Sequence, residues 1–268
     1  MTERLASSGD GRPITALDDG RGPNLLVVHP GGGDAATWDG ITRQLTDDFR
    51  VVRILRRVYA PGADIALPHS MAVEAADIVA VAGLIKPPVL LVGHSSGAVA
   101  AMEAALLAPS AFTGLFLYEP PMPTGELVAG EAGVRARAAL DADDPVEAVR
   151  IHRRDIVRMP AGAVDAMSAD QRVRAALSTH AEALIADDEA IDALGVGTER
   201  FATLEMPTTL VVGDLNPAHL RERLADPAAT LPNARIVTLS GQGHVAHLTA
   251  PDTLADAVRE TAEQVLHT

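Results

Sequence analysis

The strongest constraint on the fold of this chain is a set of short apolar runs separated by stretches of a different character. The runs are rich in Val, Leu and Ile, are bounded by Gly, Pro or polar residues, and span 24–30, 50–55, 88–95, 114–120, 208–214 and 234–241. Near-continuous apolar strands of this length are typical of parallel sheets that are buried on both faces. Ala-rich stretches with helical periodicity lie between them, as at 72–85 and 97–108. The alternation predicts the α/β class, with an open, mostly parallel sheet flanked by helices.

One interval, residues 122–206, breaks this alternation. It contains no convincing strand pattern but several helical ones, and Asp144 followed by Pro145 is a typical helix start, with the aspartate as cap and the proline in the first turn. We therefore predict a helical insertion over 122–206 that packs as a lid on a core domain made of residues 1–121 and 207–268.

Composition narrows the class of protein further. The formal net charge of -14 over 268 residues opposes binding to nucleic acid or to an anionic membrane, so neither is expected as a partner. The chain has no cysteine, which excludes disulfides, thiolate metal sites and a cysteine nucleophile. No apolar run approaches the ~20 residues that span a bilayer. The first residues carry no apolar segment of the signal-peptide type, so a cytoplasmic location is expected.

The segment Gly93-His94-Ser95-Ser96-Gly97 is a G-x-S-x-G sequence that follows an apolar strand and opens a helix of small residues. A serine on such a strand-to-helix turn is held in a strained conformation with its hydroxyl exposed. The turn brings the two backbones close together, and Gly93, Gly97 and Ala98 are small enough to allow it. A phosphate-binding loop would instead require a lysine or a GKS/GKT ending, which is missing here.

On this segment, and on "GQGHVAH" near the C-terminus, the chain resembles the α/β-hydrolase fold enzymes over nearly its whole length. The resemblance implies that Ser95 is the nucleophile and that the backbone N–H of Ser96 forms half of an oxyanion hole. The other half should come from the loop "HPGGG". Pro30 has no N–H to donate, so the expected donor is Gly31, with Gly32 as the second choice.

A serine nucleophile requires an adjacent base, usually a histidine. His244 follows the last predicted strand in the manner of the family's C-terminal Gly-x-Gly-His, and it is favoured over His247. Four other histidines, His69, His152, His180 and His219, lack such flanking and are expected on the surface or in the lid. Arg135, Arg137, Arg153 and Arg154 are expected to form a solvated helix face.

The acid that orients the histidine is missing from its usual place in the sequence. The family most often has it three residues after the glycine that ends the strand at 208–214, and this chain has Asn216 there, which carries no charge. Glu119 ends the preceding apolar run, an alternative position that haloalkane dehalogenases of this fold use, and Asp214 is the other candidate. Glu119 is favoured because it lies at a carboxyl strand end, follows a buried run and precedes prolines that fix its direction.

With Ser95, His244 and Glu119 the natural reaction is acyl transfer. The sequence predicts a serine hydrolase that acts on an ester, a lactone or a related acyl compound through an acyl-enzyme, with no metal or cofactor. The Ala-, Val-, Leu- and Met-rich insertion predicts an apolar pocket for a small hydrophobic acyl substrate, in a monomer or a homodimer. Two alternatives stay open: lyase or perhydrolase chemistry with the same triad, and a ligand receptor that retains a slow triad.

Overall fold

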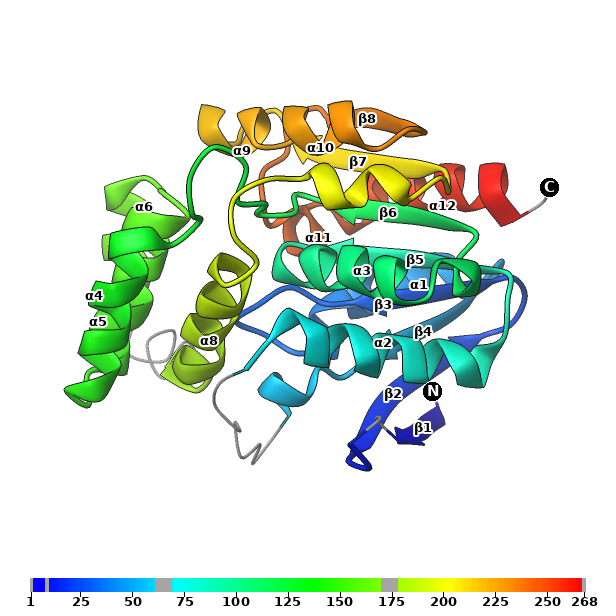
Figure 1. The fold of residues 1–268 in the computed structure, drawn as a ribbon, viewed down its shortest axis with the longest axis horizontal. Helices are drawn as coiled ribbons and strands as arrows, with labels where there is room; N and C mark the ends of the chain where they lie inside the picture. The colour runs from blue at the N-terminus through cyan, green and yellow to red at the C-terminus, as the bar shows by residue number, and fades with distance from the viewer. Residues whose placement is uncertain (1, 8–9, 61–68, 170–177, 267–268) are drawn as a thin grey trace.

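The computed structural model describes residues 2–7, 10–60, 69–169 and 178–266. Its centre is a twisted eight-stranded sheet with the strand order β1-β2-β4-β3-β5-β6-β7-β8 (Figure 1). The strands are β1 Thr2–Ser7, β2 Pro13–Gly20, β3 Asn24–Val28, β4 Arg50–Ile54, β5 Val89–His94, β6 Gly114–Tyr118, β7 Thr208–Gly213 and β8 Ala234–Leu239. Helices cover both faces of the sheet, so the predicted α/β class with a mostly parallel sheet is confirmed.

All six predicted apolar runs form strands, and those strands, β3 to β8, pair in parallel. The two strands that the apolar runs did not predict, β1 and β2, pair antiparallel at one edge. The register that positions the site is that of β5 and β6, in which His94 lies opposite Tyr118. The next residues, Ser95 and Glu119, therefore leave adjacent strands at the same carboxyl edge of the sheet.

Each face of the parallel strands carries its own hydrophobic core. One core contains Leu26, Val28 and Leu91 and packs against α2 (Met71–Ile85) and α3 (Ser96–Leu107). The other contains Leu25 and Val27 and packs against α1 (Asp39–Leu45) and α12 (Pro251–Leu266). The alternation arises because successive strand side chains point to opposite faces. The shorter elements of the core are η1 Ala35–Trp38, η2 Arg57–Tyr59, η3 Pro109–Ala111, α9 Ala218–Glu222, α10 Ala225–Thr230 and α11 Ala246–Thr249.

Helices fill the chain between β6 and β7, and no strand occurs in the described part of 122–206. They are α4 Gly130–Asp141, α5 Pro145–Ile151, the π-helical turn η4 His152–Ile156, α6 Ala161–Ala169, α8 Ala181–Asp192 and η5 Glu199–Thr203. Asp144 caps α5 as predicted, since its side chain accepts from the Glu147 N–H at 3.0 Å. The predicted helical pattern over 170–177 lies outside the described residues. Figure 1 shows α4, α5 and α6 beside one end of the sheet, with α8 between them and the sheet.

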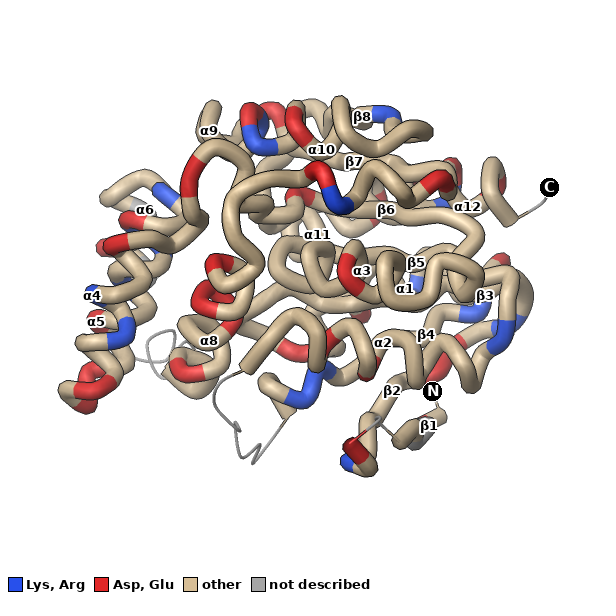
Figure 2. The backbone as a smooth tube through the Cα atoms, viewed as in Figure 1, with Lys and Arg blue, Asp and Glu red and all other residues tan. Residues whose placement is uncertain are grey.

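Charged residues are spread over the whole backbone (Figure 2). Acidic residues line α8, and in the other elements acidic and basic residues are mixed. The net charge of -14 is thus not gathered into one region of the described chain. Within the described ranges, no helix combines the length and apolar character needed to cross a membrane. The division into a core domain and a lid domain stays a prediction.

Candidate active site

Ser95 occupies a sharp turn between β5 and α3, with φ 53° and ψ -128°. Its backbone N–H donates to the Tyr118 carbonyl at 2.8 Å, which ties the turn to the end of β6. The flanking glycines are needed for space: a Cβ on Gly93 would lie 2.5 Å from the Ala98 Cα, and one on Gly97 would lie 2.6 Å from the Val28 carbonyl oxygen. This is the strained strand-to-helix geometry that the G-x-S-x-G sequence predicts.

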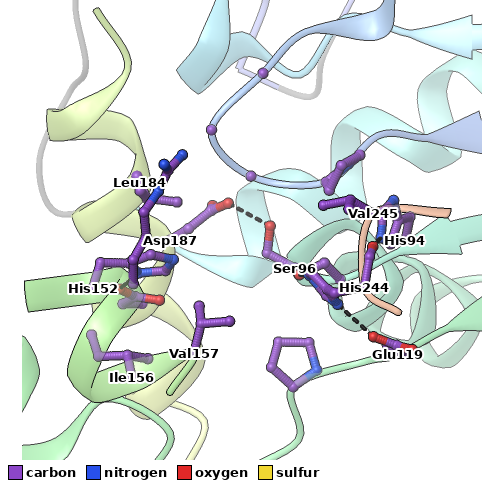
Figure 3. A pocket seen from close by; sticks show the side chains of 18 of the residues that line it. His94, Ser96, Glu119, His152, Ile156, Val157, Leu184, Asp187, His244 and Val245 are labelled. Atoms are coloured by element: carbon purple, nitrogen blue, oxygen red, sulfur yellow. Dashed lines mark hydrogen bonds and ion pairs between the residues drawn. The ribbon is translucent and has the colours of Figure 1, made fainter. Parts of the chain in front are cut away.

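A continuous hydrogen-bond chain joins Ser95, His244 and Glu119. The Ser95 Oγ lies 3.2 Å from the His244 Nε2, and the His244 Nδ1 lies 2.6 Å from the Glu119 Oε2. Figure 3 shows His244 between the elbow and Glu119, which reaches it from the end of β6. The Glu119 backbone has φ 50°, a left-handed conformation that is unusual for a residue other than glycine and that aims its buried carboxylate at the histidine.

Asp214 and Asn216 lie in the loop after β7, and each forms hydrogen bonds with a neighbouring loop of the site. The Asp214 carboxylate accepts from the Gly241 N–H at 2.7 Å and from the Ser240 hydroxyl at 3.3 Å, so it secures the loop after β8. The Asn216 side-chain amide donates to the Glu119 Oε1, and its oxygen accepts from the His244 N–H at 2.9 Å. Asn216 therefore does not contact the imidazole in place of an acid; it fixes the His244 main chain and the Glu119 carboxylate together.

His94 and Tyr118, the residues directly before Ser95 and Glu119, hold the loop that carries His244. The His94 Nε2 donates to the His244 carbonyl at 3.1 Å, and the Tyr118 hydroxyl donates to the Gly243 carbonyl. The His94 ring stacks on Tyr118 and meets the His247 ring edge-on, with 4.6 Å between centroids in each pair. Burial and the adjacent histidines lower the pKa of His94 well below its usual value, and burial followed by His244 lowers the pKa of His247 to about 4. Both rings are therefore neutral near pH 7.

The glycine loop after β3 lies against the elbow. A Cβ on Gly31 would lie 3.2 Å from the Ser96 Oγ and 2.9 Å from the Tyr59 hydroxyl oxygen, so only glycine fits beside them. His29 fixes the start of the loop: its Nδ1 donates to the Pro30 carbonyl at 2.8 Å, and its Nε2 accepts from a backbone N–H at 3.3 Å. Burial, followed by the charge of Arg56, lowers the pKa of His29 to about 3.

A cavity of about 370 Å³ opens onto Ser95 and His244. Its surface is mainly apolar, and its volume falls in the range typical of small-molecule sites. In Figure 3 the insertion supplies the wall opposite His244, with Ile156, Val157 and Leu184. His152 also lines the cavity, and its Nδ1 lies 2.7 Å from the buried Asp188 Oδ2.

The other insertion residues follow their predictions in part. Arg135, Arg137 and Arg154 form ion pairs with nearby acidic side chains, as expected of a helix face. Arg153 departs from that expectation, since it lines the cavity. His180 stays outside the cavity lining and packs edge-on against Tyr59, with 5.7 Å between ring centroids.

Sequence reasoning missed a buried charge cluster beside the elbow. The Arg56 side chain is wholly buried, and its guanidinium donates to the Glu74 carboxylate at 2.9 Å and to the Asp187 carboxylate at 2.7 Å. His69 was expected on the surface, but its side chain is buried, with Nε2 3.1 Å from the Asp187 Oδ1. No local motif marks this cluster, because Arg56 and Asp187 are separated by 131 residues in the chain.

Comparison with known proteins identifies the family of this chain. Residues 25–257 match the model of the alpha/beta hydrolase family. Pimeloyl-[acyl-carrier protein] methyl ester esterase of Methylococcus capsulatus is 36% identical over 121 residues, which are 41% of this chain and 44% of that protein. Polyketide synthase ThaQ of Burkholderia thailandensis is 30% identical over 293 residues, which cover 99% of this chain and 13% of that protein. The chain thus matches less than half of the length of either curated relative.

Among solved structures, an alpha/beta hydrolase from Sphaerobacter thermophilus superimposes with a TM-score of 0.83 at 27% identity. The match covers 96% of this chain and 99% of that one. The family match extends over most of the sequence and agrees with the sheet order and the elbow geometry. The chain therefore belongs to the alpha/beta hydrolase family.

Proposed function

We propose that the protein hydrolyses carboxylic esters, lactones or related acyl compounds through a triad of Ser95, His244 and Glu119. The observation that supports this most directly is the hydrogen-bond chain from the Ser95 Oγ through His244 to the Glu119 Oε2, which opens onto an apolar cavity. A serine hydroxyl in contact with an imidazole that is itself oriented by a carboxylate is the arrangement that activates a serine nucleophile.

In the first half of the proposed reaction, the His244 Nε2 takes the proton of the Ser95 hydroxyl as the Oγ attacks the substrate carbonyl. The carbonyl oxygen becomes an oxyanion, which the backbone N–H groups of Gly31 and Ser96 stabilise. Gly31 is favoured over Gly32 because a Cβ on Gly31 would lie 3.2 Å from the Ser96 Oγ, whereas one on Gly32 would have only Leu184 nearby. The tetrahedral intermediate then collapses, and His244 gives its proton to the leaving alcohol.

In the second half, water attacks the acyl-enzyme while His244 again accepts the proton, and the carboxylic acid leaves as Ser95 regains its hydrogen. Glu119 stabilises the imidazolium in both halves and keeps one ring orientation throughout. Its second oxygen, Oε1, accepts from the Gly213 N–H at 2.8 Å and from Asn216, which prevents the carboxylate from rotating away.

The cavity and one relative support the substrate class. A mainly apolar space of about 370 Å³ suits a small hydrophobic acyl group, with the carbonyl at the Ser95 end. The Methylococcus capsulatus relative is named as a methyl ester esterase, which favours ester cleavage over amide cleavage.

A panel of p-nitrophenyl esters of increasing acyl length, assayed with the purified protein, tests the proposal. We expect multiple turnover on short and medium chains, with release of the free acid. A fluorophosphonate probe should label the wild type and the Ser240→Ala control, whose serine is exposed and lies outside the cavity lining, but not Ser95→Ala. A single slow turnover would favour a receptor, and labelling that survives in Ser95→Ala would exclude Ser95 as the nucleophile.

A further inference from the structure

Asp187 lies on α8 of the helical insertion, yet its carboxylate is buried against the core beside the elbow (Figure 3). Its Oδ2 accepts two hydroxyl hydrogens, from Ser96 at 2.7 Å and from Tyr59 at 2.8 Å. Its Oδ1 accepts from the Arg56 guanidinium at 2.7 Å and lies 3.1 Å from the His69 Nε2. All four of these partners lie outside the insertion.

One of the two hydroxyls belongs to Ser96 of the elbow, and the other, on Tyr59, lies against the glycine loop. Ser96 supplies one of the proposed donor N–H groups, and its Oγ also accepts from the Arg56 guanidinium at 2.9 Å. The Tyr59 hydroxyl oxygen lies beside the glycine loop, where a Cβ on Gly31 would come within 2.9 Å of it. A single carboxylate oxygen thus connects the elbow to the glycine loop.

The charge of the cluster fixes the direction of these hydrogen bonds. Burial alone would raise the pKa of Asp187, but the Arg56 guanidinium, His69 and the Ser96 hydroxyl together lower the pKa well below its usual value, so the carboxylate stays ionised. An ionised carboxylate only accepts, so both hydroxyls must donate to it. Hydroxyl hydrogens that cannot rotate give a more rigid site.

The same carboxylates could be considered as metal ligands, since one ligand atom from each of His69, Glu74 and Asp187 lies within 4.8 Å of the others. The Arg56 guanidinium, however, donates to both Glu74 and Asp187. A cation in this group would have to displace a buried guanidinium from both of its partners. The cluster is better explained as a buried ion network than as a metal site.

We propose that Asp187 is a positioning residue through which the helical insertion sets the geometry of the oxyanion hole. The inference rests on the proposed function, because it assigns a purpose to the Ser96 and Gly31 amides. A donor that is displaced rather than deleted should cost less than the 10²- to 10³-fold loss in kcat that deletion brings. It follows that α8 stays docked during turnover, since lifting it would release both halves of the hole.

The test compares Asp187→Asn with Asp192→Asn. Asparagine keeps the shape of Asp187 and leaves Arg56 balanced by Glu74, so the cluster keeps no unpaired buried charge. Asp192 lies on the same helix but accepts from the backbone N–H groups of Val128 at 2.7 Å and Gly130 at 2.8 Å, within the insertion. Active sites are first counted with a fluorophosphonate, so that kcat is expressed per competent site.

For Asp187→Asn we expect kcat per site to fall about 10- to 100-fold while KM changes by less than about threefold. Affinity for a trifluoromethyl ketone, which forms an oxyanion adduct with the serine, should fall in proportion to kcat. Affinity for the product acid, which does not form that adduct, should stay near the wild-type value. Asp192→Asn should match the wild type in all three measurements.

The outcomes separate this inference from the proposed function. If the wild type neither turns over esters nor takes the probe, the proposed function fails. If the wild type is active and Asp187→Asn keeps its kcat and its ketone affinity per site, the positioning role is refuted. If Asp187→Asn does not fold, the Ser96→Ala/Tyr59→Phe double variant decides: parallel losses of kcat and ketone affinity support the role, and wild-type values overturn it.

Discussion

Replacing Glu119 with glutamine changes one oxygen of the carboxylate to an NH₂ group in a site where each oxygen has a defined partner. Oε1 faces two donors, the Gly213 N–H at 2.8 Å and the Asn216 amide, while Oε2 faces the His244 Nδ1 at 2.6 Å. The glutamine oxygen must stay with the two donors, which turns its NH₂ toward His244. The NH₂ then donates to Nδ1 and drives the imidazole proton onto Nε2, so that Nε2 can no longer accept from Ser95.

The alternative rotamer of the glutamine is no better. It would place the NH₂ against the Gly213 and Asn216 donors, and each buried donor left without an acceptor costs about 1–3 kcal/mol. In a serine protease triad the wrong tautomer lowers kcat by about 10⁴-fold. We therefore expect Glu119→Gln to lose about 10³- to 10⁴-fold in kcat, or about 4–5.5 kcal/mol of transition-state stabilisation.

The assay is steady-state hydrolysis of the best p-nitrophenyl ester, with urea unfolding used to confirm that the variants are folded. Asp214→Asn is the matched control, because it removes a carboxylate whose partners are Gly241 and Ser240 rather than the histidine. It should keep kcat within about threefold, given the small effect expected of an exposed hydrogen bond. If Asp214→Asn loses activity by orders of magnitude and Glu119→Gln does not, the assignment of the acid is wrong.

Three further predictions follow from the packing of the site. Gly97→Ala places a Cβ 2.6 Å from the Val28 carbonyl oxygen, so it should destabilise the fold by about 3 kcal/mol in urea unfolding; a stable variant would refute the close approach. Asn216→Ala frees Glu119 to rotate and should lower kcat about 10- to 100-fold with little change in KM, and full activity would show that the bridge is dispensable. His247 has its pKa lowered to about 4, so the unfolded chain binds more protons below about pH 6.5, and folding stability is lost as the pH falls from there toward 4. His247→Leu should flatten that dependence by at most about 1.4 kcal/mol per pH unit, and an unchanged slope between pH 7 and 5 would exclude the histidine as its source.

The sequence predicts the parallel part of the sheet well because its central strands β3, β5 and β6 are buried on both faces and mainly apolar. The antiparallel strands β1 and β2 escaped notice because they lack a continuous apolar run. β1 reads TERLAS, and β2 reads PITALDDG. An alternation search over 13–20 would have found β2, whose burial alternates along the strand.

Some residues of the candidate site could be predicted from short sequence motifs, and others could not because their contacts form only in the folded chain. Ser95 and His244 carry local signals, a glycine-flanked elbow and a glycine-rich loop after a strand, and the structure brings them within 3.2 Å of each other. Glu119 was chosen because Asn216 left the usual acid position without a charge. The bridging role of Asn216 itself depends on three loops that meet only in the folded chain, so no spacing in the sequence reports it.

The Arg56–Asp187 cluster shows most clearly which contacts cannot be predicted from sequence patterns. A buried arginine cannot be told from a surface arginine by its neighbours in sequence, and its partner lies 131 residues away in a helix rich in acidic residues (Figure 2). Pairing across such a distance is decided by tertiary packing, which single-sequence patterns do not encode.

Direct detection of the acyl-enzyme gives the sharpest test of the proposed chemistry. The protein is mixed with a slowly deacylated p-nitrophenyl ester, quenched in acid within the first turnover and mapped by peptide mass spectrometry. We expect the mass of one acyl group on Ser95, with none on Ser96, and no adduct in Ser95→Ala. Ester turnover without an adduct on Ser95, or an adduct at another residue that forms as fast as p-nitrophenol is released, would contradict the proposed mechanism.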